Sequence, residues 1–179
     1  DLMTETTSLA GIIETPFCVI LGQRPGPGTG LPTWSAQADL NLALYSSHGE
    51  FARVVLAVSD PVDSFDLIQH ALNLAEKYQV PALVLTEKVV AESNMTIMPF
   101  KQKKIPIERG LVTGKALEQL VNSDRYRITK SGLSKRWIPG SSEAYWFANS
   151  DEHLEDGSLT EDAGPVAQMY AKRVRKIGL

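Results

Sequence analysis

The residues best suited to chemistry lie in one short stretch, residues 23–33, which reads Gln-Arg-Pro-Gly-Pro-Gly-Thr-Gly-Leu-Pro-Thr. Arg24 carries a permanent planar charge that can grip a carboxylate or phosphate through two parallel hydrogen bonds. The glycines permit close backbone approach and positive φ, while the prolines stiffen the loop. Because Pro25 and Pro27 lack amide donors, the loop is not a full phosphate cradle of the Walker type. The stretch therefore predicts a ligand-binding loop in which Arg24 can bind an anion.

Three apolar runs are expected to form the framework that positions this loop. Residues 17–21 form a continuous apolar run, which is typical of a buried strand covered on both faces. Residues 54–58 and 82–86 repeat that pattern, with helical spacing between the runs. Because crossovers between such strands are nearly always right-handed, we predict an α/β fold, a parallel sheet with helices on both faces. The loop would follow the carboxyl end of the first strand, where ligands usually bind in such sheets.

Helical segments are expected around these strands. A first helix should end near Glu14, because Pro16 biases the preceding residue away from helical geometry. A second should follow the loop, with Thr33 or Ser35 as its cap. A third should begin at Asp60, an N-cap residue followed by a proline. The apolar stripe of this third helix, which we expect in the core, comprises Phe65, Ile68, Leu72, Ala75 and Tyr78.

The regular alternation fades after the third strand. We expect residues 1–100 to form the latter part of an α/β domain, residues 101–165 an irregular excursion with an acidic linker, and residues 166–179 a terminal helix. A short helix is predicted within residues 114–122. The basic side chains near the carboxyl end of the terminal helix suit the helix dipole and need no special partner; they are Lys172, Arg173, Arg175 and Lys176.

Two further groups of charged residues have a structural and a functional interpretation. Acids on both sides of His153 suggest either a metal site or an acidic linker, and we favour the linker because the spacing matches no strong ligand pattern. The lysines within residues 101–104 are expected to form a solvated face, because the protein as a whole is acidic.

Composition limits the classes of function. With 179 residues and 43% hydrophobic content, the chain can bury one ordinary core. A net charge of -3 gives no reason to expect binding to nucleic acid or an anionic membrane, and no apolar run approaches a membrane span. We therefore expect a soluble, cytoplasmic protein. Cys18 is the single cysteine and is expected to be a small core residue, so the chain alone cannot hold an iron–sulfur cluster. The start at Asp1 suggests a fragment of a longer chain.

Several longer motifs point to one family. They lie at residues 1–5, 23–33, 37–40, 74–78, 125–129, 132–140 and 152–153. On these motifs the chain resembles the alpha subunit of the thiamine diphosphate-dependent 2-oxoacid:ferredoxin oxidoreductases, particularly the 2-oxoglutarate branch. The resemblance covers nearly the whole chain, and the motif at residues 23–33 is its most specific part.

The resemblance assigns roles to the loop residues. Arg24 would hold the substrate carboxylate in attacking geometry. Gly26, Gly28 and Gly30 would shape the loop, and Thr29 would be a hydroxyl donor to ligand or backbone. No catalytic residue is expected within this fragment, because the glutamate that activates the cofactor would lie in a preceding stretch.

The resemblance also implies an assembly. Thiamine diphosphate would be shared with a beta subunit that supplies magnesium and an iron–sulfur cluster, in a hetero-oligomer that converts a 2-oxoacid and coenzyme A to an acyl-CoA and reduces ferredoxin. Trp34 would shield the site or pack on the following helix, and Arg136 would have no role beyond a subunit contact. The alternative is a non-catalytic subunit-interaction fragment with no activity of its own.

Overall fold

The computed structural model describes residues 2–100 and 105–179, and these contain one three-stranded parallel sheet. Its strands are β1 (Phe17–Gln23), β2 (Val54–Ala57) and β3 (Pro81–Glu87), in the spatial order β1-β3-β2. Leu85 of the central strand pairs with Leu21 on one side and Ala57 on the other. The predicted parallel α/β sheet is confirmed.

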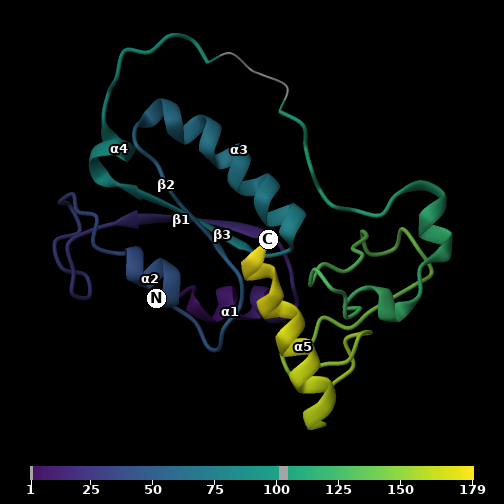
Figure 1. Cartoon of the computed structure of the whole chain (residues 1–179). Helices are drawn as coiled ribbons and strands as arrows, with labels where there is room; N and C mark the ends of the chain where they lie inside the picture. The colour runs from purple at the N-terminus through teal and green to yellow at the C-terminus, as the bar shows by residue number, and fades with distance from the viewer. Residues whose placement is uncertain (1, 101–104) are drawn as a thin grey trace.

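Helices cover both faces of this sheet (Figure 1). They are α1 (Thr4–Ile12), α2 (Leu40–Tyr45), α3 (Pro61–Tyr78) and, after the sheet, the short α4 (Lys88–Glu92). On one face α3 contributes Ala71 and Ala75 to a core with Ala82 and Val84. On the other face Ala43 of α2 packs against Leu83 and Leu85. No helix in the described part of the chain is long and apolar enough to cross a bilayer.

Helix α3 follows the sequence prediction most closely. Asp60 is its N-cap, and the carboxylate accepts the amide hydrogens of Val62 and Asp63 at 2.8 and 2.9 Å. Ala75 is buried as expected, but Leu72 is 48% exposed. The prediction was wrong for Leu72, because the core between α3 and the sheet is formed by Ala71 and Ala75, with Leu67 and Ile68 packed against it.

Strand β1 differs from the prediction in its burial. It lies at the edge of the sheet, and Ile20 is 64% exposed, so the strand is not covered on both faces. The continuous burial belongs instead to the central strand β3. Cys18 packs beside the α3 core as predicted, and burial raises the pKa of its thiol.

Residues 105–165 contain little regular structure but are not an exposed linker. The short helix predicted within residues 114–122 forms as a 3₁₀ helix, Gly114–Gln119, and a second 3₁₀ helix, Asn122–Asp124, follows it. A second core forms here around the buried Trp137. The lysines at 101–104 lie outside the described residues.

His153 belongs to this folded region. Its side chain is fully buried and lies against Tyr126, with 4.3 Å between ring centroids. Its ring nitrogens lie 2.8 Å from the carbonyl oxygen of Leu154 and 3.2 Å from that of Ile12. The expectation of an acidic linker was wrong at this residue, because backbone carbonyls and an aromatic ring give the imidazole a buried place.

Helix α5 (Ala163–Arg175) closes the structure and lies beside the irregular region (Figure 1). The basic side chains at its carboxyl end, with Lys176 just beyond the helix, were expected to need no special partner. This prediction was wrong for Lys172, Arg173 and Lys176, which are all buried. The ammonium groups of Lys172 and Lys176 each lie 2.5 Å from a carboxylate oxygen of Glu14. Arg173 pairs with Glu152. Burial demands partners for these charges.

Arg125 completes the cluster around Glu14. One of its Nη2 hydrogen bonds goes to the carbonyl oxygen of Ile13 and another to that of Glu14, each at 2.9 Å. Burial alone would raise the pKa of Glu14, but the charges of Lys176, Lys172 and Arg125 lower it to about 2. Glu14 is therefore ionised at neutral pH.

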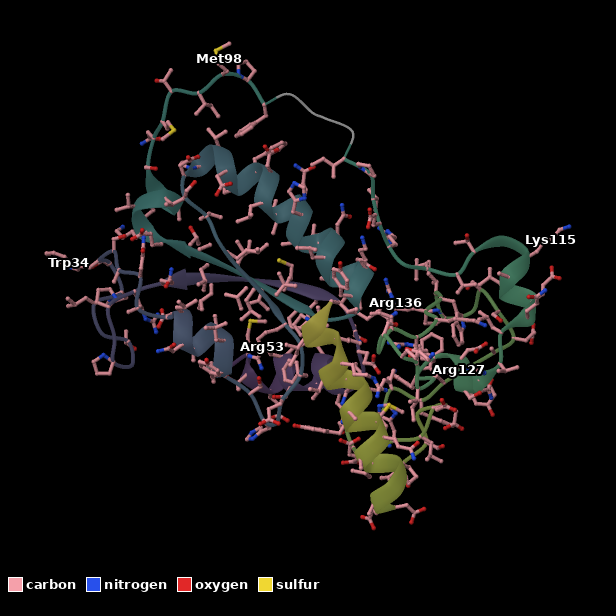
Figure 2. The ribbon with its side chains drawn as sticks, in the orientation of Figure 1. Trp34, Arg53, Met98, Lys115, Arg127 and Arg136 are labelled. Atoms are coloured by element: carbon pink, nitrogen blue, oxygen red, sulfur yellow. The ribbon has the colours of Figure 1, made fainter. Side chains whose placement is uncertain are left out.

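Arg136 also has a partner inside the chain. It pairs with Glu76 of α3 and donates to the carbonyl oxygen of Arg109. Figure 2 shows it between the irregular region and the end of α3. The structure thus gives Arg136 an intramolecular role, and the subunit contact stays a prediction.

Replacing Glu14 should destabilise the protein strongly. Glu14→Gln removes the carboxylate charge from beneath two buried ammonium groups, which should lower the free energy of unfolding by about 3–5 kcal/mol. Urea unfolding followed by circular dichroism measures this. Glu108→Gln is the matched control, because Glu108 pairs with Lys77 at the exposed surface, and its midpoint should stay close to wild type. Equal midpoints for the two variants would contradict a buried charge cluster.

The contribution of Glu14 should disappear in acid. Its folded pKa of about 2 lies below the ordinary value of 4.5, so its stabilisation is complete above pH 4.5 and is lost as the pH falls toward 2. The gap in unfolding free energy between wild type and Glu14→Gln should therefore shrink over this range. Urea titrations of both proteins at a series of pH values test this; a gap that stays constant down to pH 2 would show that Glu14 is not the titrating group.

Candidate functional site

The carboxyl ends of all three strands meet at one edge of the sheet, because the strands are parallel. They end at Gln23, Ala57 and Glu87. A cavity of about 360 Å³ opens there. Its apolar lining consists of Leu40, Ala57, Val58 and Leu85, and its polar lining of Gln23, Gln37, Ser59, Thr86 and Glu87. This is the edge at which the sequence predicted a ligand-binding loop.

A larger cavity, of about 780 Å³, lies in the irregular region beside Asn122 and Glu155. Three of its polar side chains are engaged within the chain: Asn122 accepts the amide hydrogen of Tyr145, Glu155 that of Ile128, and Asp156 that of Ser158. We place the functional site at the smaller cavity, because the strand ends and the arginine loop converge there.

The two ends of the loop after β1 lie close together and are joined by hydrogen bonds. The side-chain oxygen of Gln23 accepts the amide hydrogen of Asp39 at 3.2 Å, and the Asp39 carboxylate lies 3.4 Å from the amide nitrogen of Arg24. Inside the loop, the amide of Leu31 donates to the carbonyl oxygen of Pro25 at 3.0 Å. The two ends of the loop are therefore tied together at the mouth of the cavity.

Arg24 keeps its guanidinium available for an anion. The side chain is exposed, and its one hydrogen bond among the described residues is a long one, 3.4 Å, to the carbonyl oxygen of Gly28. It does not tie the loop to a helix end. This placement suits the predicted carboxylate grip, and the role itself stays a prediction.

The loop-shaping glycines differ in what the fold requires of them. Gly28 and Gly30 have φ of +60° and +55°, whereas Gly26 does not adopt a positive φ. A Cβ on Gly30 would lie 1.8 Å from the carbonyl oxygen of Pro25, so no side chain fits there. The hydroxyl of Thr29 is exposed and has no hydrogen-bond partner among the described residues, which leaves it free for a ligand.

Trp34 lies at the outer end of the loop and is 65% exposed (Figure 2). It is therefore not packed into the following helix. That helix begins later than predicted, with Asp39 at the N-cap position, so neither Thr33 nor Ser35 caps it.

Glu87 is the site residue that sequence reasoning missed. It accepts a hydrogen bond from Ser35 and another, at 2.8 Å, from Gln37. These bonds, that from Ser35 first, lower the pKa of the Glu87 carboxyl. A charged residue at the end of a buried apolar run was the available signal, but its partners lie about fifty residues away in sequence.

No group of three or more His, Cys, Asp or Glu side chains in the described residues is arranged to hold a metal ion. The cluster around His153 is thus accounted for by internal contacts and provides no such arrangement.

Known proteins resemble the chain over nearly its full length. A family model described as pyruvate flavodoxin/ferredoxin oxidoreductase, thiamine diphosphate-binding, matches residues 1–170. The alpha subunit of 2-oxoacid:ferredoxin oxidoreductase 1 from Sulfurisphaera tokodaii is 38% identical over 99% of the chain and 28% of the relative. The 2-oxoglutarate synthase subunit KorA from Methanothermobacter marburgensis is 39% identical over 79% of the chain and 42% of the relative.

A solved structure from a related enzyme also matches the chain over nearly its full length. The 2-oxoglutarate:ferredoxin oxidoreductase from Magnetococcus marinus, with 2-oxoglutarate, coenzyme A and succinyl-CoA bound, matches with a TM-score of 0.88 and 36% identity. The match covers 99% of this chain and 30% of that one. The chain thus spans less than a third of the length of this structure and of the archaeal alpha subunit.

The loop should tolerate a side chain at Gly26 and not at Gly30. In Gly30→Ala the new methyl group collides with the Pro25 carbonyl, which should break the hydrogen bond from the Leu31 amide to that carbonyl. Strain of about 1–3 kcal/mol should make the Leu31 amide hydrogen exchange about tenfold faster or more. In Gly26→Ala the nearest atom would lie 3.8 Å away. Amide hydrogen exchange by NMR distinguishes the two. Equal exchange in both variants would contradict the loop geometry.

Proposed function

The chain belongs to the thiamine diphosphate-binding pyruvate flavodoxin/ferredoxin oxidoreductase family, and from that premise we propose that it is part of the alpha subunit of a 2-oxoacid:ferredoxin oxidoreductase. In this proposal the complete enzyme oxidatively decarboxylates a 2-oxoacid, in particular 2-oxoglutarate, forms the acyl-CoA and passes electrons to ferredoxin. The names of the archaeal relatives and of the matched structure support the reaction class and the substrate.

The observation that carries this proposal is the placement of Arg24. Arg24 directly follows Gln23, which lines the cavity at the carboxyl edge of the sheet. The guanidinium of Arg24 is exposed and makes no ion pair with any described residue. A planar guanidinium can bind a carboxylate through two parallel hydrogen bonds. A 2-oxoacid presents such a carboxylate beside its reacting keto carbon. Arg24 would therefore fix the orientation of the substrate at its reacting end.

Orientation is a large part of what this chain can contribute to the reaction. Holding reactants in attacking geometry supplies about 7–11 kcal/mol of the barrier in favourable cases. Gly30 and Gly28 give the loop its shape, and the free hydroxyl of Thr29 can donate to a bound ligand. The tie between Gln23 and Asp39 holds the base of the loop at the cavity.

The cavity also suits the organic part of the cofactor. Its apolar floor, which includes Leu40 and Leu85, and the amide and carboxylate groups of its rim fit a flat, polar ring. When bound, thiamine diphosphate supplies the carbanion stabilisation that decarboxylation needs. We propose that it is shared with a beta subunit that provides magnesium and the iron–sulfur cluster, with ferredoxin and coenzyme A as further partners in a cytoplasmic hetero-oligomer.

A non-catalytic interaction fragment is the second candidate. Exposed apolar side chains on α2 favour a contact there with another protein surface: Leu40 is 51% and Tyr45 77% exposed. Such a contact is compatible with the enzyme as well, and it leaves the free guanidinium of Arg24 unexplained. We therefore favour the catalytic assembly, to which this chain contributes substrate binding.

Arg24→Ala in the full-length subunit, assembled with its beta partner, should lower kcat/KM for the 2-oxoacid by about 100-fold, because a charge-assisted contact with the substrate is lost. Reduction of ferredoxin or an artificial dye measures this. Arg24→Lys should recover part of the loss. Arg109→Ala, which removes another exposed arginine, is the control and should leave the kinetics unchanged.

Two results would count against this function. Wild-type kinetics in Arg24→Ala would remove Arg24 from substrate binding. An assembled wild-type complex that reduces neither ferredoxin nor dye with any 2-oxoacid and coenzyme A would favour the non-catalytic interaction fragment.

A further inference from the structure

Glu87 stands at the end of the central strand and contacts the middle of the arginine loop. It is the last residue of β3, whose preceding residues are buried. One carboxylate oxygen accepts the Ser35 hydroxyl, and the other accepts the Gln37 amide at 2.8 Å. Ser35 in turn accepts the amide hydrogen of Val89 at 3.3 Å. The central, most buried strand of the sheet is thus joined to the loop by the side chain of Glu87.

The rest of the loop has few attachments. Among the described residues, the hydrogen bonds that tie residues 25–38 to later parts of the chain all end on Glu87 or Val89. The loop's remaining hydrogen bonds join Arg24 to Gly28 and close its own turns. Without Glu87, only the bond between the Val89 amide and the Ser35 hydroxyl would, among the described residues, join the middle of the loop to later parts of the chain.

We propose that Glu87 is a positioning residue that holds the Arg24 loop, through Ser35 and Gln37, in the conformation that presents the Arg24 guanidinium to the substrate. This inference rests on the proposed function of Arg24. A carboxylate suits the task because it offers an acceptor oxygen to each of two donors. Both oxygens are engaged within the protein, so Glu87 acts through the loop and not by contact with substrate.

A residue that positions Arg24 behaves differently from one that only stabilises the fold. If Glu87 acts through Arg24, replacing Glu87 should not lower kcat/KM any further in a variant that already lacks the Arg24 guanidinium. If Glu87 acts independently of Arg24, the fold-losses in kcat/KM of the two single variants should multiply in the double variant. A double-mutant cycle on kcat/KM separates these cases.

The test uses the full-length subunit assembled with its beta partner. Glu87→Ala should lower kcat/KM for the 2-oxoacid by about tenfold, the change expected for the loss of about 1.4 kcal/mol of transition-state stabilisation. Arg24→Ala with Glu87→Ala should be no slower than Arg24→Ala alone. Amide exchange in the peptides that cover residues 25–38 should accelerate in Glu87→Ala. Glu87→Gln, which keeps one acceptor oxygen, should recover part of both effects.

Two further variants complete the design. Glu92→Gln is the control, because Glu92 follows on the adjacent helix and pairs with Lys88 away from the loop; both readouts should match wild type. Ser35→Ala together with Gln37→Ala removes the two donors and leaves Glu87 in place. This double variant tests the attachment of the loop to Glu87 even if Glu87→Ala fails to fold. It should reproduce the loss in kcat/KM and the faster loop exchange.

Three outcomes would overturn the proposal. Losses that multiply in the double variant would show that Glu87 does not act through Arg24. Unchanged exchange of residues 25–38 in Glu87→Ala would show that it does not hold the loop. Wild-type kcat/KM in Arg24→Ala would show that Arg24 does not bind the substrate, so Glu87 would have no substrate-binding residue to position. If the loop amides nevertheless exchange faster in Glu87→Ala, the proposed function of Arg24 is wrong, whereas the attachment of the loop to Glu87 is right.

Discussion

The structure depends most on the carboxylate of Glu14, which lies buried beneath Lys172 and Lys176. Removing three charges from water costs several kcal/mol per ion, and only their mutual contacts offset that cost. Arg125 adds hydrogen bonds to the adjacent backbone, where Glu14 is held at an uncommon φ of +50°. This cluster joins the end of α1, the irregular region and helix α5 in one place.

That cluster also explains what the sequence could not predict. Strands β1 to β3 and the start of α3 follow from local signals, namely apolar runs and the Asp60 cap, and these elements were predicted. Lys172 and Glu14 are bonded but lie 158 residues apart in the chain, so no local sequence pattern predicts their contact. A basic helix end has the same sequence whether it is solvated or buried.

The candidate site divides in the same way. The place of the Arg24 loop at the carboxyl edge of the sheet follows from a strand followed by a Gly/Pro loop, and it was anticipated. The burial of β1 was not, because strand order decides which strand lies in the centre, and the chain's second crossover places β3 there. Glu87 was missed because its meaning depends on the folded path of Ser35 and Gln37.

The two charged clusters have opposite consequences for function. The ions around Glu14 are buried and mutually paired, so they fix the framework and therefore the position of the strand ends. The Glu87 contacts are solvent-accessible and join only one loop to that framework. Regions with few contacts open at low free-energy cost, which suits the substrate-binding role proposed for the loop. In the proposed function, stability and substrate recognition therefore depend on different residues: the Glu14 cluster holds the framework, whereas Glu87 sets the orientation of Arg24.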